Sequence, residues 1–141
     1  MIVPEETLRS MSALALAHMG DAVYEILVRR ELCRSGGYTA GDLHRQTIRY
    51  VSAAAQARAA KKILPRLTPE ENAVYRRGRN AHSHAAPRNT SEGEYHAASG
   101  LEALFGWLYL REESARIEEL FAIIMEEDHA AGRNGADGAA P

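Results

Sequence analysis

The sequence feature that most constrains the fold is a long apolar pattern of helical period over residues 12–35. Apolar side chains recur there every three or four positions, and the pair Gly36-Gly37 then supplies a stop. These side chains are Leu16, Met19, Ala22, Val23, Ile26 and Leu27. Because no stretch of alternating β-branched residues competes with this pattern anywhere in the chain, we expect an all-α fold.

Start and stop signals divide the middle of the chain into further helices. Thr39 opens a helix-start pattern, and the helical stripe that follows continues to Leu64 with a break near Ser52. Thr68 precedes a proline and two acidic residues, which together favour the first turn of another helix. That helix is expected to fade at Gly78.

Two more helices are expected before the chain ends. The first begins at Thr90 or Ser91, and the second follows Ser114. The apolar face of the first is formed by Tyr95, Ala98, Leu101, Leu104, Phe105, Leu108 and Tyr109. Because the last residues are rich in glycine and alanine, we expect one domain over residues 1–131 and a disordered tail over residues 132–141.

Cysteine usage and hydropathy restrict the compartment. Cys33 is the single cysteine of the 141 residues, so neither an internal disulfide nor a cysteine zinc cluster can form. The first ten residues lack the basic flank and apolar run of a signal peptide, and no uncharged apolar run is long enough to span a bilayer. We therefore expect a cytoplasmic protein without a membrane partner.

Charge is distributed unevenly along the chain, although the net charge is only -2. No acidic residue lies between Glu71 and Glu92, while that interval holds several arginines and histidines. The same interval contains the longest irregular connection, from about Arg77 to Ser91. Long ordered loops are often functional, so we expect a polyanion contact here, with a solvated loop as the alternative.

An aspartate adjoins the apolar stripe of the first long helix. His18, Asp21 and Glu25 stand at i, i+3 and i+7, so they share one face of that helix. Gly20 in a helix interior costs about 1 kcal/mol relative to alanine, which indicates that another element approaches the backbone closely. The alternative is that both acids only pair with arginines such as Arg29 at the edge of the core.

A second acid, Glu102, stands in the still more apolar stretch SGLEALFGWLYL, with Gly106 one turn later. If the two helices pack together, Asp21 and Glu102 are able to hold a magnesium ion, which favours one or two carboxylates together with water and phosphate oxygens. Such an ion activates water and neutralises charge on phosphorus, which is the chemistry of phosphodiester hydrolysis.

These stretches resemble the ribonuclease III family. LAHMGDAVYE is similar to the signature helix of its nuclease domain, and GLEALFGWLYL is similar to the later helix that supplies further metal ligands. GDLHRQTIRYVSAAAQA, residues 41–57, is similar to the segment between them. The resemblance spans about residues 12–130, and it implies a helical nuclease-domain bundle in which Asp21 and Glu102 are catalytic, metal-binding acids.

Within the family, the wording of RRGRNAHSHAAPRNT and FGWLYLREE is most similar to the short Mini-III group, which lacks an appended double-stranded-RNA-binding domain. That resemblance implies a Mg²⁺-dependent endoribonuclease that acts as a homodimer, with two sites that cut the two strands of an RNA duplex. The implied substrate is the stem joining the ends of precursor 23S (large-subunit) ribosomal RNA, with a ribosomal protein bound to it as a further candidate partner. Apolar residues around Phe105, Trp107 and Tyr109 are a candidate dimer surface, although a monomer core is able to absorb them.

The chain departs from the full-length family pattern at three acidic positions, which here are Ala17, Ser99 and Ala40. The site is therefore expected to have fewer protein ligands, and whether it holds one or two magnesium ions stays open. Glu25 and Ser99 are candidate supporting residues. For Glu25 a salt bridge to a nearby arginine is the favoured alternative, and His18 is a weaker candidate because a nitrogen ligand suits softer metals.

Without a separate RNA-binding domain, the nuclease domain itself must contact the duplex. A-form RNA is recognised mainly through phosphates and 2′-hydroxyls, which requires arginines, amides and hydroxyls. Candidate RNA-binding residues of these types, and two histidines, are Arg76, Arg77, Arg79, Asn80, His82, Ser83, His84, Arg88, Asn89 and Thr90. We expect them to contact the duplex beside the active site, with binding that weakens steeply with salt.

Two other function classes remain open. The first is a non-catalytic RNA-binding ribosome assembly factor with the same fold, which the reduced ligand set allows. The second is a helical metal phosphohydrolase that acts on nucleotides. It is disfavoured because no adjacent His-Asp pair with a third histidine at matching helix positions is present.

Overall fold

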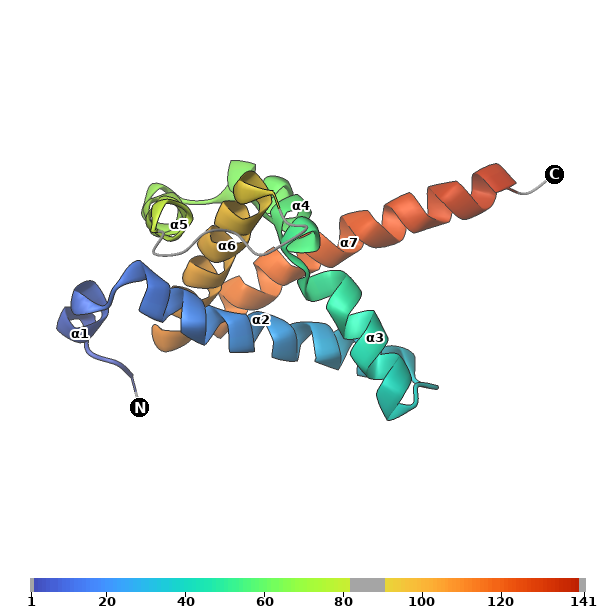
Figure 1. The fold of residues 1–141 in the computed structure, drawn as a ribbon, viewed down its shortest axis with the longest axis horizontal. Coiled ribbons are helices and arrows are strands. Elements are labelled where there is room, and N and C mark those ends of the chain that lie inside the picture. The colour runs from blue at the N-terminus through green and yellow to red at the C-terminus, as the bar shows by residue number, and fades with distance from the viewer. Residues whose placement is uncertain (1, 82–90, 140–141) are drawn as a thin grey trace.

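The computed structural model describes residues 2–81 and 91–139, with side chains up to residue 126. Every regular element in these residues is helical, which confirms the all-α fold class (Figure 1). In chain order the helices are α1 (Glu5–Ser10), α2 (Ala13–Ser35), α3 (Ala40–Val51), α4 (Ala53–Ile63), the short 3₁₀ helix η1 (Leu64–Arg66), α5 (Pro69–Asn80), α6 (Glu92–Leu110) and α7 (Ser114–Ala139). None of the helices described is long and apolar enough to cross a membrane.

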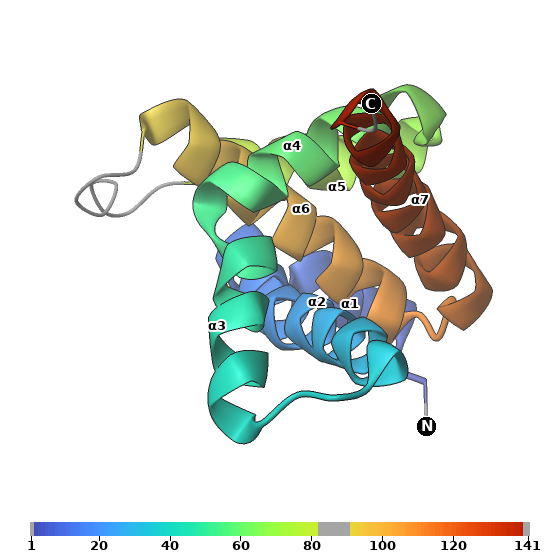
Figure 2. The same ribbon diagram turned by 90° about the vertical axis from the view of Figure 1, so that its right-hand side faces the viewer.

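Helix α6 is the centre of the bundle. It packs against α2, α4, α5 and α7, and Figure 2 shows it enclosed between α2 and α4. Leu101 and Leu108 on one face of α6 are 0% exposed, and Ala103 and Trp107 on the opposite face are 0% and 7% exposed, so α6 is covered on more than one face. A helix that is apolar nearly all round is stable only when neighbours cover it, and this explains its central place.

Local capping signals define the helix starts, as the sequence predicts. The side chains of Ser12, Ser52 and Ser91 each accept a hydrogen bond from a backbone N–H in the first turn of the helix that follows. Thr39 and Thr68 form reciprocal capping boxes with the acid three residues later. Ser52 also separates α3 from α4, which confirms the predicted break.

Some expectations about the helices differ from the structure. Helix α1 has no predicted counterpart, and α5 continues past Gly78 to Asn80. Ala22 and Ile26 belong to the predicted inward stripe of α2 but are exposed, because α6 covers the opposite face of that helix. The inward face is formed instead by neighbours such as Val23 and Leu27.

Helix α7 is longer than expected. Its backbone stays helical to Ala139, within the segment 132–141 that composition assigns to a disordered tail. Figure 1 shows the C-terminal part of α7 extending beyond the other helices. The division of the chain into a domain over residues 1–131 and a tail remains a prediction.

A buried ion pair connects α5 to α7. The carboxylate of Glu71, 5% exposed, accepts hydrogen bonds from two nitrogens of Arg116, each at 2.8 Å. Arg116 also donates to the backbone carbonyl of Arg66 at 2.8 Å. Burial by itself raises the pKa of Glu71, but the hydrogen bonds and charge of Arg116 outweigh it, so the pKa of Glu71 lies below its usual value.

We expect Arg116→Ala to destabilise the protein by about 3 kcal/mol, because it leaves the buried Glu71 carboxylate without its cation. Urea unfolding followed by circular dichroism at pH 7 measures this loss. Arg34→Ala is the matched control, since Arg34 pairs only at the surface with Glu31 at 3.4 Å and should change stability by less than about 0.5 kcal/mol. Equal losses in the two variants would contradict a structural role for the buried pair.

Candidate active site

Two glycines bring α2 and α6 into backbone contact. A Cβ atom added at Gly20 would lie 1.5 Å from the carbonyl oxygen of Glu102, and one added at Gly106 would lie 2.1 Å from the carbonyl oxygen of Leu16. Any side chain larger than hydrogen would therefore push the helices apart. The close approach that Gly20 indicates in the sequence is present, and the approaching element is α6.

This crossing places Asp21 beside Glu102. Asp21 directly follows Gly20 on α2, and Glu102 stands one turn before Gly106 on α6. Asp21 is exposed, whereas Glu102 is half-buried among core residues of α6. The two carboxyl groups therefore lie close together, and that of Asp21 is open to solvent.

The surroundings of Glu102 favour its neutral form. Burial, the negative charge of Asp21 and a hydrogen bond with the Asp21 side chain raise the pKa of Glu102 to about 8. Two carboxyl groups that share a proton in this way are unfavourable as a pair of free anions. A cation bound between them would replace that proton and relieve the repulsion.

The other candidate residues contribute unequally to this pair. Glu25 forms an exposed salt bridge with Arg29 at 3.2 Å, which is the alternative that the sequence favours. His18 is exposed on the same helix, and Ser99 is 9% exposed one turn before Glu102. No group of three or more histidine, cysteine, aspartate or glutamate side chains that could hold a metal occurs among the residues described.

The candidate RNA-binding residues that the structure describes are helical and do not belong to an irregular loop. Helix α5 continues beyond Gly78 to Asn80, so these candidates belong to its C-terminal part. The exposed side chains there are Arg76, Arg77, Arg79 and Asn80. Arg77 donates to the backbone carbonyl of Met11 at 3.2 Å, while Arg79 lines a cavity between α4, α5 and α6. These two arginines therefore lie on different sides of α5.

The remaining RNA-binding candidates lie outside the described residues. They are His82, Ser83, His84, Arg88, Asn89 and Thr90. Their assignment stays a prediction from the sequence.

Sequence reasoning missed a second group of cations. Arg49 on α3 and Arg58 and Lys62 on α4 line one cavity beside Tyr24. The signal that could have found them is the absence of any acidic residue from Leu43 to Pro69, a longer acid-free interval than the one between Glu71 and Glu92.

The chain is similar to known proteins over most of its length. The ribonuclease III domain family matches residues 14–113, a range that contains both Asp21 and Glu102. The chain is 45% identical over 111 residues to the Mini-ribonuclease 3 of Symbiobacterium thermophilum, covering 79% of this chain and 85% of that protein. It is 43% identical over 114 residues to the Mini-ribonuclease 3 of Enterococcus faecalis, covering 79% and 86%.

A solved structure shares the fold. The crystal structure of protein FN1578 from Fusobacterium nucleatum is similar with a TM-score of 0.77 at 30% sequence identity. The similarity covers 86% of this chain and 97% of that one, so most of the bundle has a counterpart there.

Proposed function

The chain belongs to the ribonuclease III family and is an endoribonuclease of that type, and we propose that it cleaves double-stranded RNA with Mg²⁺ held by Asp21 and Glu102. The observation that carries the proposal is the carboxyl pair at the crossing of α2 and α6, one member exposed and the other held neutral by its surroundings. Such a pair on two rigid helices is a preformed site for a cation that a phosphate-containing substrate completes.

The donor set fits magnesium better than a softer metal. Structural or catalytic zinc takes three or four protein ligands, commonly nitrogen or sulfur, whereas magnesium keeps several waters and needs only one or two carboxylates. Asp21 and Glu102 match the second requirement. When bound, Mg²⁺ would supply Lewis-acid chemistry, by activating water and neutralising charge that develops on the phosphate.

The two carboxyl groups have different tasks. Glu102, half-buried between the helices, must lose its proton when it binds a cation. Asp21 presents its carboxylate at the surface, where a phosphate of the RNA backbone has access. The backbone contact at Gly20 fixes their separation, because neither helix is able to shift without breaking it.

In this proposal, exposed hydrogen-bond donors on the nuclease domain bind the RNA duplex. Arg76, Arg79 and Asn80 present such groups on α5, and the arginine-rich segment that follows continues the same chemistry in the sequence. The proposed substrate is the paired stem that joins the ends of precursor 23S ribosomal RNA, as the resemblance to the short Mini-III group implies. A ribosomal protein on that RNA and a cytoplasmic location are parts of the same proposal.

We further propose that the protein acts as a homodimer, a state typical of the family. The surface around Trp107 that the sequence favours is largely used by the monomer, since Phe105 is 0% and Trp107 7% exposed, the latter covered by Arg111. A better surface is the exposed face of α2. Ala15, Ala22 and Ile26 share that face, and Ile26 is 66% exposed.

A second copy covering this face would bury the exposed apolar side chain of Ile26. Ile26→Asp is therefore expected to convert the dimer to a monomer, with at least a tenfold weaker association, about 1.4 kcal/mol. Sedimentation equilibrium measures the change. Tyr109→Asp is the control, because Tyr109 is 51% exposed on α6, and dissociation by that variant instead would place the interface there.

The function is tested by incubating the purified protein with a long, perfectly paired RNA and with each of its single strands, with and without Mg²⁺. We expect cleavage of the duplex only, only with Mg²⁺, and products with 5′-phosphate ends. Duplex that is bound but never cut, even as precursor ribosomal RNA, would instead identify an assembly factor. Turnover of free nucleotides without RNA cleavage would identify a phosphohydrolase.

A further inference from the structure

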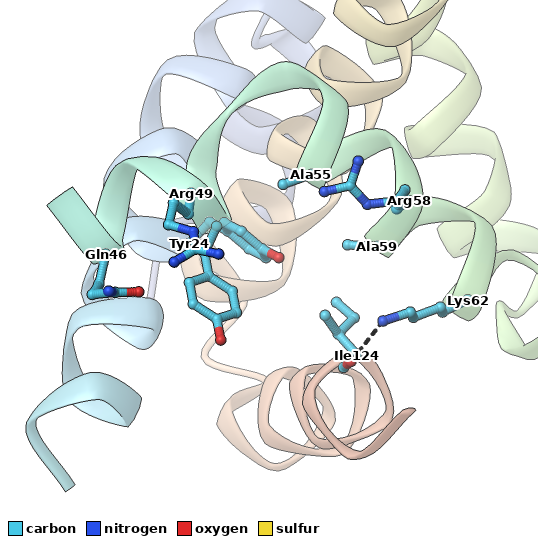
Figure 3. Close-up of a pocket in the computed structure, with 9 residues that line it drawn as sticks. Tyr24, Gln46, Arg49, Ala55, Arg58, Ala59, Lys62 and Ile124 are labelled. Atoms are coloured by element: carbon cyan, nitrogen blue, oxygen red, sulfur yellow. Dashed lines mark hydrogen bonds between the residues drawn. The ribbon is translucent and has the colours of Figure 1, made fainter. Parts of the chain in front are cut away.

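A cavity of about 380 Å³ lies between α3, α4 and α7, beside Tyr24 of α2 (Figure 3). Its volume is at the lower end of the range that small organic ligands occupy. Neither Asp21 nor Glu102 lines it. Tyr24 packs edge-on against Phe105 with ring centroids 5.4 Å apart, so the cavity adjoins the core side of α2.

Among the described residues that line this cavity, every charged side chain is positive. Arg49 comes from α3, and Arg58 and Lys62 come from α4 on the opposite side, as Figure 3 shows. Among the residues that the structure describes, none that lines the cavity carries a carboxylate. Arg49 and Arg58 give this concave surface a local positive potential, which an anion would neutralise.

The two arginines have no acidic partner in the part of the chain that the structure describes. Elsewhere on the surface, Arg29 pairs with Glu25, Arg30 pairs with Glu118, and Arg45 pairs with Asp42. No ion pair of Arg49 or Arg58 with a described residue is present, and the chain carries no acid from residue 43 to residue 69 that could pair with them locally. Their donors thus remain available to an external ligand.

Other features of the cavity hold its positive groups in place. The Lys62 ammonium donates to the backbone carbonyl of Ile124 at 3.1 Å, which fixes its position between α4 and α7 (Figure 3). Ala55 lines the cavity from the first turn of α4. Gln46 adds an amide on the α3 side.

The uncharged lining indicates what the anion is attached to. Tyr24, Tyr50, Ala59 and Ile124 give the cavity aromatic and aliphatic walls beside its cations. Tyr24, Ala59 and Ile124 are each at most 3% exposed, so half-buried Tyr50 is the aromatic side chain on which the flat base of a nucleotide is able to stack beside the cations. We propose that this cavity binds the phosphate group of a nucleotide, either free or as part of an RNA strand.

The test uses the full chain and the double variant Arg49→Gln with Arg58→Gln. The matched control, Arg9→Gln with Lys61→Gln, removes the same charge from exposed residues that do not line the cavity. Circular dichroism first establishes that both variants fold. Adenosine monophosphate is then titrated into each protein by calorimetry, and duplex RNA binding is measured by fluorescence anisotropy without Mg²⁺ at one salt concentration.

A free nucleotide is the ligand if adenosine monophosphate binds the wild type and the control but binds the cavity variant about tenfold more weakly or worse. An RNA phosphate is the ligand if the free nucleotide does not bind and the cavity variant loses at least about tenfold more duplex affinity than the control. The proposal is overturned if the cavity variant and the control match in both measurements. None of these binding readouts requires RNA cleavage, so they stand apart from the proposed catalytic function.

Discussion

Replacing Gly20 with alanine is expected to destabilise the protein by more than about 4 kcal/mol, a large part of the roughly 5 to 15 kcal/mol by which an ordinary domain is stable. The added Cβ would lie 1.5 Å from the carbonyl oxygen of Glu102 and 2.8 Å from the backbone nitrogen of Gly106. Both contacts are to backbone, which cannot rotate away as a flexible side chain can. The helices must separate, and separation exposes the core that α6 shares with α2.

Gly93→Ala is the matched control for this substitution. Gly93 belongs to the first turn of α6, and nothing lies within 4 Å of the Cβ that alanine would add there. Since alanine favours helix, we expect this variant to equal the wild type or exceed it by up to about 1 kcal/mol. Urea unfolding of the wild type, Gly20→Ala and Gly93→Ala measures their free energies of unfolding. Wild-type stability in Gly20→Ala would show that the two backbones do not touch in solution.

Replacing Glu102 with glutamine is expected to lower the rate of RNA cleavage by about 10³-fold while the fold is kept. Glutamine has nearly the same shape as the neutral carboxyl group that the site favours, so packing is unchanged. It carries no negative charge and cannot replace a carboxylate on Mg²⁺. Single-turnover cleavage of a paired RNA gives the rate, and thermal unfolding gives the stability.

The pH dependence of stability provides a second readout for Glu102. Its pKa is raised from 4.5 to about 8 in the folded protein, chiefly by burial. The folded state therefore holds a proton that the unfolded state releases. In the absence of metal, this contribution to stability is fully present below pH 4.5 and is lost as the pH rises through about 8. Glu102→Gln should lack that loss, and an identical pH profile in both proteins would contradict the buried, neutral carboxyl.

Glu25→Gln is the control for activity. Glu25 stands one turn after Asp21, but its carboxylate pairs with Arg29 at 3.2 Å and both side chains are largely exposed. Exposed pairs of this kind contribute less than about 1 kcal/mol. We expect cleavage within about twofold of the wild type, whereas a loss as large as that of Glu102→Gln would make Glu25 a third ligand.

What the sequence predicts correctly depends on short-range physics. The serines and threonines that cap α2, α3, α4, α5 and α6 accept a hydrogen bond from a backbone N–H only three residues later. Their role can therefore be predicted from the sequence without a structure. The meeting of Asp21 and Glu102 is predictable for a related reason. Each acid stands near a glycine in an apolar helix, and that pairing indicates two backbones in close contact.

Features that depend on long-range packing cannot be predicted from local sequence in this way. The outward direction of Ala22 and Ile26 depends on which face of α2 receives α6, and helical periodicity alone places both in the stripe. Likewise, the burial of Glu71 requires Arg116, which lies 45 positions away. The cationic cavity is formed where α3 and α4 meet α7, which the sequence does not show. The one sequence feature that indicates it is the acid-free interval from Leu43 to Pro69.

The most direct test of the central claim is single-turnover cleavage of a long, perfectly paired RNA by the wild type and by Asp21→Asn across a Mg²⁺ titration. If Asp21 and Glu102 together hold the ion that cleavage requires, the wild-type rate should rise with Mg²⁺ and saturate. Asp21→Asn should then remain folded, bind the duplex and stay inactive at every concentration. Cleavage by Asp21→Asn at the wild-type rate, or wild-type cleavage that does not depend on Mg²⁺, would contradict the proposed site.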